Sequence, residues 1–260
     1  MPLTVAGAYS ATGAAWQAGP GRIYDGLSDH LVARSPVELT GRVMLDLGAG
    51  TGAATRALLR RGARPVGIDA AVGMLRAGAA ARPPGVVADV RALPVRSGAV
   101  GGVVAAYVLN HLADPVRALR EAGRVTRAGG PILVATYAED DGHPVRAAVD
   151  RAVAEAGHRP DDWYGWMRDR AFPLLSTVER AEAALPAAGL TGRVTNDRIA
   201  FTGLTPDDLV AWRLGMAHLA PFVAALGAAH RRRLAQRAAE LLGADPPVLE
   251  RSVITIAAVA

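Results

Sequence analysis

Residues 43–62 read VMLDLGAGTGAATRALLRRG: an apolar run, three glycines at alternate positions, and then a helical pattern. A glycine-rich turn between a strand and a helix lets the backbone approach a ligand closely, and the N-terminus of the helix favours polar or anionic groups. The segment Gly48-Ala49-Gly50-Thr51-Gly52-Ala53 fits the loose dinucleotide-binding pattern G-x-G-x-x-G/A. Because this turn also suits other nucleotide-type ligands, the ligand has to be identified from residues further along the chain.

The alternation of strand and helix patterns continues to residue 138. Short apolar runs predict buried strands, and segments with helical periodicity separate them. The expected strands are 42–47, 65–70, 85–90, 101–109 and 131–138, and the expected helices are 53–61, 70–80 and 115–126. Strands that alternate with helices at this spacing indicate βαβ units and a parallel sheet.

Beyond residue 138 the pattern becomes less regular. The expected elements are a helix over 177–190 that Pro186 closes or kinks, strands at 192–201 and 252–259, and two helices within 205–243. Residues 139–175 are first polar and then aromatic. The insertions 139–175 and 205–245 should lie at the ends of sheet elements, where open α/β sheets bind their ligands.

Composition excludes several classes of protein. The 260 residues suit one large domain or a domain with insertions. The chain has no lysine, its formal charge is +5, and its arginines are spread along the sequence. Coding bias therefore explains the excess of arginine better than binding to a polyanion does. Cysteine is absent, which excludes disulfides and thiolate metal sites. We expect neither a signal peptide nor a membrane span, and therefore a soluble cytoplasmic protein.

Two aspartates follow the glycine turn at the ends of expected strands. Asp69 lies about 20 residues beyond the glycines, where a carboxylate can accept hydrogen bonds from both ribose hydroxyls of a nucleotide. Asp89 ends the next strand, where an acceptor can take the adenine amino group. The alternative for both residues is that the acid caps the following helix.

Five motifs occur in an order and spacing that resemble the class I S-adenosylmethionine (SAM)-dependent methyltransferases: DLGAGTG, GIDAAVGML, ADVRALP, LNHLADPVRALREAGRVTRAGG and ILVATY. The likeness is strongest to the ubiquinone-methyltransferase-like branch that acts on small molecules, and it covers residues 40–138 well. It implies a doubly wound, seven-stranded, mostly parallel α/β sheet with a Rossmann-like methyltransferase fold and helical insertions that form a lid. One departure is visible, since Gly101-Gly102 replace the aspartate that usually starts the fourth strand.

The resemblance implies four parts of the chain and a set of cofactor-binding residues. The parts are an N-terminal lid segment at 1–36, a SAM-binding core at 37–138, an inserted segment at 139–176 that covers the substrate, and the rest of the sheet at 177–260 with its helical insertion at 205–245. The residues implied to hold SAM are Asp46, Gly48, Gly50, Gly52, Asp69, Ala70, Met74, Asp89, Val90, Tyr107 and Asn110. In this arrangement Asp46 takes the amino group, the glycines line the methionine part, Asp69 binds the ribose, and Asp89 and Val90 recognise the adenine edge.

His111 is the candidate catalytic base, because a neutral imidazole suits proton abstraction from a phenol or alcohol near pH 7. An amine or an acidic carbon would need no base, and the alternative for His111 is a packed ring at a helix start. The candidate substrate-binding residues are Tyr9, Trp16, Tyr24, His143, Trp163, Trp166, Trp212 and Met216. For the aromatic residues the alternative is simple packing of the inserted helices, and for His143 it is an ordinary loop position.

Methyl transfer from SAM to a small molecule is the function that the residues favour, with no metal. The composition suits a high-GC bacterium, and the insertions suit secondary metabolism. One alternative is another SAM-using reaction such as a cyclisation, because fold does not fix chemistry. A nucleic-acid methyltransferase is less favoured, since Asn110-His111-Leu112-Ala113 lacks the Pro-Pro-aromatic motif, and so is an NAD-dependent dehydrogenase, since the chain has no lysine for a Tyr/Lys pair. A non-catalytic SAM-binding module stays open, because it requires a blocked pocket and the sequence does not show one. We expect no nucleic-acid or membrane partner and a monomer or homodimer.

Overall fold

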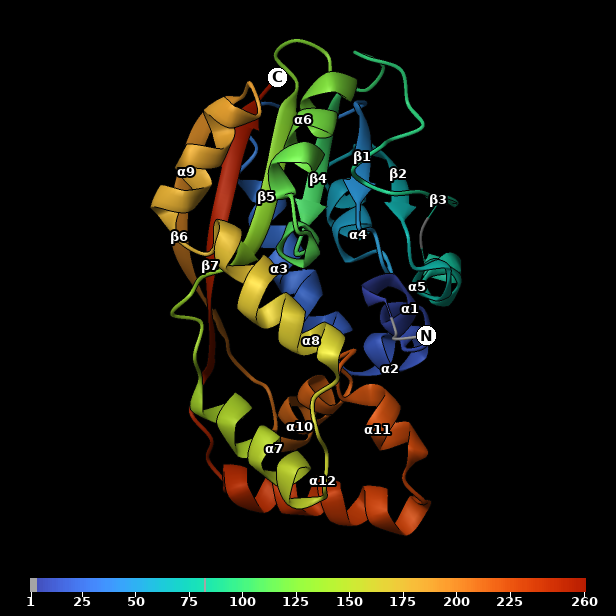
Figure 1. Cartoon of the computed structure of the whole chain (residues 1–260), viewed down its shortest axis with the longest axis vertical. Helices are drawn as coiled ribbons and strands as arrows, with labels where there is room; N and C mark the ends of the chain where they lie inside the picture. Colours follow the sequence, from blue (N-terminus) through green and yellow to red (C-terminus); the bar gives the residue numbers. More distant parts are fainter. Residues whose placement is uncertain (1–3, 82) are drawn as a thin grey trace.

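A computed structural model describes residues 4–81 and 83–260 of the chain. Its centre is one seven-stranded sheet with the strand order β3-β2-β1-β4-β5-β7-β6 (Figure 1). The strands are β1 (Val43–Leu47), β2 (Arg64–Asp69), β3 (Gly85–Val87), β4 (Gly102–Ala106), β5 (Pro131–Tyr137), β6 (Thr191–Phe201) and β7 (Leu249–Val259). The first five strands are parallel, whereas β7 runs antiparallel to both β5 and β6. The expectation of a seven-stranded, mostly parallel α/β sheet is confirmed.

Helices cover both faces of the sheet because both faces of its central strands are apolar. The covering helices are α3 (Gly21–Ala33) and α4 (Ala53–Arg60) on one face, and α6 (Pro115–Val125) and α9 (Val178–Ala187) on the other. Leu27 and Leu58 belong to the core of the first face, and Leu119 and Leu185 to the core of the second. Pro186 lies inside the last turn of α9, and the helix ends one residue later.

Three short helices pack beside the carboxyl ends of the strands (Figure 1). They are α1 (Val5–Ser10), α2 (Gly13–Ala18) and α5 (Val72–Ala77). Glycines allow their close approach: a Cβ on Gly73 would lie 1.8 Å from the carbonyl oxygen of Ser10, and a Cβ on Gly13 would lie 2.7 Å from the Cβ of Ala77. The N-terminal segment is therefore packed against the part of the chain that follows β2.

The inserted segments build a helical module beyond the same end of the sheet (Figure 1). It consists of α7 (Pro144–Glu155), α10 (Pro206–Leu214), α11 (Ala220–Ala225) and α12 (Ala228–Leu242). The module has a small apolar core of its own, to which Val149, Val210 and Leu234 belong. From α7 the chain returns towards the sheet through α8 (Asp162–Trp166), a π-helical turn at Met167–Ala171 and a 3-10 turn at Phe172–Leu175.

Residues 205–243 form three helices, so the expectation of two was wrong. The first ends at Gly215, where a Cβ would lie 2.6 Å from Pro20, and the last begins after Gly227. Other differences are shifts of element ends: the strand expected at 85–90 stops at Val87, and the helix expected at 70–80 is α5 followed by a 3-10 turn at Ala79–Ala81. Within the part of the chain that the structure describes, we find no helix that is both long and apolar enough to span a membrane.

Candidate active site

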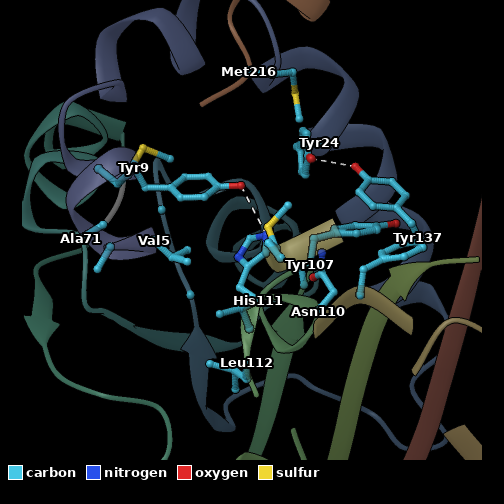
Figure 2. Close-up of a pocket in the computed structure, with 18 of the residues that line it drawn as sticks. Val5, Tyr9, Tyr24, Ala71, Tyr107, Asn110, His111, Leu112, Tyr137 and Met216 are labelled. Atoms are coloured by element: carbon cyan, nitrogen blue, oxygen red, sulfur yellow. Dashed lines mark hydrogen bonds between the residues drawn. The ribbon is translucent and has the colours of Figure 1, made fainter. Parts of the chain in front are cut away.

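A cavity of about 730 Å³ opens at the carboxyl ends of β1, β2, β4 and β5. Its walls come from the glycine turn, the N-terminal helices, α8 and the helical module. Figure 2 shows side chains from α1, α3, the turn after β4, β5 and the segment after α10 around the same space. Ligands of open α/β sheets bind at this edge, so this cavity is the candidate site.

The glycine turn after β1 has a backbone that other residues adopt rarely. Gly48, Gly50 and Gly52 have φ angles of +69°, +52° and +93°. A Cβ on Gly48 would lie 2.5 Å from the Cβ of Val108, so only glycine fits there. Gly48 and Gly50 line the cavity, as expected, whereas Gly52 is not among the lining residues and is instead the N-cap of α4.

The carboxylate of Asp69 lies directly beside this turn. It accepts hydrogen bonds from the backbone N–H of Gly50 at 2.8 Å and of Ala71 at 2.7 Å. Asp46, buried at the end of β1, accepts a hydrogen bond from the hydroxyl of Thr55 at 2.6 Å. Both aspartates line the cavity, and Asp69 ties the end of β2 to the glycine turn.

The next group of expected residues lies along the same wall. Ala70, Met74, Asp89 and Val90 all line the cavity, and the methyl group of Met74 lies 3.4 Å from the position of a Cβ on Gly50. Asp89 forms an ion pair with Arg91, with the closest atoms 2.7 Å apart. Hydrogen bonding to the Arg91 guanidinium holds the pKa of the Asp89 carboxyl below its usual range. A ligand that uses Asp89 as an acceptor therefore has to share it with Arg91.

Two buried polar groups follow β4. Tyr107 has a φ angle of +58°, a conformation that is rare for a residue with a side chain. The residue is 5% exposed. Among the described residues, neither the hydroxyl of Tyr107 nor the Oδ1 of Asn110 has a hydrogen-bond partner. Burial raises the pKa of Tyr107 well above its ordinary value, so the phenol stays protonated. Unpaired buried polar groups at a strained backbone position are typical of a ligand site.

His111 and Tyr9 meet at the wall of the cavity, where their side chains are hydrogen-bonded (Figure 2). The Nε2 atom of His111 lies 3.3 Å from the Tyr9 hydroxyl, and the two ring centroids are 5.2 Å apart. Burial lowers the pKa of His111 to about 4, so the imidazole is neutral at pH 7. This contact joins α1 to the turn after β4, and it places a neutral ring nitrogen beside the cavity.

Aromatic rings form most of the remaining wall. The hydroxyl of Tyr137 donates a hydrogen bond of 2.7 Å to that of Tyr24, and the rings of Tyr107 and Tyr137 lie 4.7 Å apart (Figure 2). The expected substrate-binding residues that line the cavity are Tyr9, Trp16, Tyr24, Trp163, Trp166, Trp212 and Met216. His143 is not among the lining residues, because its ring accepts a hydrogen bond from the N–H of Val145 at the start of α7. The structure therefore does not bring His143 to the site.

Several lining residues have no counterpart in the expectations from sequence. The most notable are the buried arginines Arg213 and Arg251, the partly exposed Arg146, and Asp141 and Tyr137. A local signal existed for Tyr137, which ends an expected strand as Asp69 does. No local pattern indicated the arginines, because Arg146 and Arg213 come from the two inserted segments and Arg251 comes from the last strand.

The described residues 4–81 and 83–260 contain no group of three His, Cys, Asp or Glu side chains arranged to hold a metal ion.

Comparisons with known proteins find methyltransferases. Residues 45–134 match a family described as a methyltransferase domain. A demethylmenaquinone methyltransferase of Mycolicibacterium paratuberculosis is 42% identical over 97 residues, which make up 37% of this chain and 42% of that protein. The match thus spans about two fifths of that relative's length. An uncharacterized methyltransferase of Mycobacterium sp. (strain JLS) is 34% identical over 171 residues, which are 57% of this chain and 68% of that protein.

A solved structure shows the same fold over nearly the whole chain. It is the complex of Haemonchus contortus phosphoethanolamine N-methyltransferase 2 with S-adenosyl-L-methionine, with a TM-score of 0.58 at 19% identity. The superposition covers 97% of this chain and 56% of that one. At such low identity the likeness concerns the fold alone.

Proposed function

Because the chain belongs to the class I SAM-dependent methyltransferases of the ubiquinone/menaquinone type, we propose that it transfers a methyl group from SAM to a small molecule held in the cavity. One observation carries the proposal: the positive-φ glycine turn and the Asp69 carboxylate meet at the wall of a cavity of about 730 Å³. We place the reaction in bacterial secondary metabolism, which the inserted helical segments favour.

The residues around the glycine turn fit the cofactor. Gly48 and Gly50 would line the methionine part, because both residues lie at the cavity wall and carry no side chain that could stand between the backbone and the ligand. Asp69, at the end of β2, would take the ribose hydroxyls, and Asp46 would take the amino group. Val90 and Asp89 would hold the adenine. The Asp89 carboxylate would then accept hydrogen bonds from both the adenine and Arg91.

SAM, when bound, would supply the methyl group of its sulfonium, and the remaining thioether part of the cofactor would be the leaving group. The protein's task is then to orient the acceptor and to keep water out, and orientation alone can lower a barrier by roughly 7–11 kcal/mol in favourable cases. The rings of Tyr9, Trp16 and Trp163 line the cavity and would help to exclude water. His111 is proposed to accept the acceptor's proton, since its imidazole is neutral at pH 7.

The cofactor assignment has a direct test. We expect SAM and S-adenosylhomocysteine (SAH) to bind the purified protein in calorimetric titrations, and we expect Asp69→Ala to abolish that binding. Mass spectrometry of the small molecules released by heat from freshly purified protein will show whether either copurifies. Unchanged binding in Asp69→Ala would mean that the ribose lies elsewhere, and binding of NAD instead of SAM would overturn the proposal.

The reaction class is tested by the product. Incubation with SAM and candidate acceptors should yield SAH and an acceptor heavier by one methyl group. Formation of an isomer of the acceptor, with SAM unconsumed, would instead indicate a rearrangement or cyclisation on the same scaffold.

A further inference from the structure

Three arginines approach the cavity on the side of β5 and β7. Arg146 comes from α7, Arg213 from α10 and Arg251 from β7. Arg213 and Arg251 are 5% and 3% exposed, and all three line the cavity. None of them lies within residues 45–134, the part that matches the methyltransferase domain family. They are therefore a feature of the inserted and C-terminal segments.

The carboxylates around these arginines do not balance their charge. Asp141 pairs with both Arg251, at 2.6 Å, and Arg146, at 3.0 Å. Arg213 pairs with Asp150 at 2.6 Å. Among the described residues, two carboxylates thus pair with three guanidinium groups. The unmatched charge falls on Arg146, whose side chain is 29% exposed at the cavity wall and is within reach of an anion from outside the protein.

Hydrogen-bond donors are also left over at this end. The Nη1 atom of Arg251 and the Nε1 atom of Trp212 are buried and have no acceptor among the described residues. A guanidinium and an indole can only donate. The guanidinium carbon of Arg251 lies 4.1 Å from the centre of the Tyr137 ring and 5.2 Å from that of Trp212, which fixes its plane.

We propose that the acceptor carries a carboxylate on a flat apolar body and that this arginine cluster, Arg146, Arg213 and Arg251, binds the carboxylate. The inference rests on the proposed function and names the substrate class of the same site. A monoanion matches the single excess positive charge, whereas the second charge of a phosphate would lie beside Asp141. The flat apolar body is assigned because aromatic rings line the cavity beside the cluster, among them Tyr137 and Trp212.

The test compares a matched pair of probes, 2-naphthoate and 2-naphthamide, in calorimetric titrations near pH 7. SAH is titrated first, and the two probes are then titrated into SAH-saturated protein. We expect the acid to bind at least about tenfold more tightly than the amide, as a charge-assisted hydrogen bond implies. The inference is overturned when SAH binds but the amide binds as tightly as the acid, or when neither probe binds. Failure of SAH itself to bind would contradict the proposed function, and the probe preference is then measured without SAH.

Variants locate the effect in the cluster. Arg146→Gln, the most exposed of the three, should reduce the preference for the acid to about threefold or less while the affinity for SAH stays unchanged. Arg251→Lys keeps a charge beside Asp141 and serves as a second variant, because it removes the unpaired Nη1 donor. Arg151→Gln is the matched control, since Arg151 lies on α7 as well but pairs with Glu155 on the surface. A preference that survives both cluster variants would place the carboxylate elsewhere.

Discussion

The neutral imidazole of His111 sets a specific expectation for the chemistry. Burial lowers its pKa to about 4, and a base this weak contributes at the lower end of the range for general bases, about a hundredfold. His111→Gln should therefore lower kcat by up to about a hundredfold and leave SAM affinity unchanged. Initial rates measured with the acceptor that gains a methyl group in the product assay check the fall in kcat. SAM titrations of the variant check its affinity.

The pH profile separates this role from simple packing. The wild-type enzyme should keep its activity as the pH falls below 6.5, because the imidazole stays unprotonated until about pH 4. An unchanged kcat in His111→Gln would show that the ring only closes the contact with Tyr9. An acid limb near pH 6.5 would show that His111 is more exposed to water than its burial indicates.

The tyrosines behind the cavity offer a matched pair of variants. Tyr137 donates its hydroxyl to Tyr24, whereas the Tyr107 hydroxyl has no partner among the described residues. Tyr137→Phe should lower the free energy of unfolding by about 1 kcal/mol, and Tyr107→Phe should change it by less than about 0.5 kcal/mol. Urea denaturation of both variants gives the comparison. An equal loss in the two would mean that the Tyr107 hydroxyl is bonded in the folded protein.

The residues that the sequence predicted well are those fixed by local pattern. Asp46 and Asp69 lie at the ends of strands and Gly48 follows one, at positions that a single strand–turn–helix unit fixes, and all three line the cavity. Arg251 could not be predicted in this way. Its contact with Asp141 joins residues 110 positions apart and depends on how β7 pairs with β5.

At the scale of elements, the packing of α1 against α5 positions the N-terminal segment beside the cavity. Gly73 allows it, because a Cβ there would lie 1.8 Å from the Ser10 carbonyl oxygen. Gly73→Ala should push α1 away, weaken SAM binding by about tenfold or more, and make residues 4–20 easier to cleave by protease. Calorimetry and limited proteolysis measure the two effects.

The control for this variant is another helical glycine. Gly165→Ala in α8 places its Cβ where nothing lies within 4 Å, and it should leave the N-terminal segment as resistant to protease as in the wild type. If Gly73→Ala leaves both SAM affinity and cleavage unchanged, the N-terminal helices do not cover the cofactor.

The inserted helices show why element types are easier to predict than their breaks. Helical periodicity over 205–243 was correct, yet it could not reveal that Gly215 packs against Pro20, a residue from the other end of the chain. Tertiary contact ends α10 there, and α11 begins five residues later. Strand β3 is shorter than its apolar run for a local reason, since the Asp89 carboxylate accepts a hydrogen bond from the N–H of Arg91, two residues later.

At the scale of the whole molecule, two parts of the chain meet at the cavity, and our proposals assign a different ligand to each. The parallel half of the sheet supplies the glycine turn and Asp69, and this half is the part that matches the methyltransferase domain family. The helical module and β7 supply the arginine cluster. Because the cavity lies between them, substrate preference can change through the module while the cofactor site stays the same.

Buried histidines make the stability of the whole molecule depend on pH. Burial lowers the pKa of His111 to about 4 and that of His218 well below its ordinary value. The unfolded chain takes up protons on these rings near pH 6.5, whereas the folded chain does not. Stability should therefore be full above pH 6.5 and fall as the pH drops towards 5, before most carboxylates titrate. Thermal unfolding across this window measures the fall, and the double variant His111→Gln/His218→Gln should flatten it. A melting temperature that does not change between pH 7 and pH 5 would mean that both rings can be protonated in the folded protein.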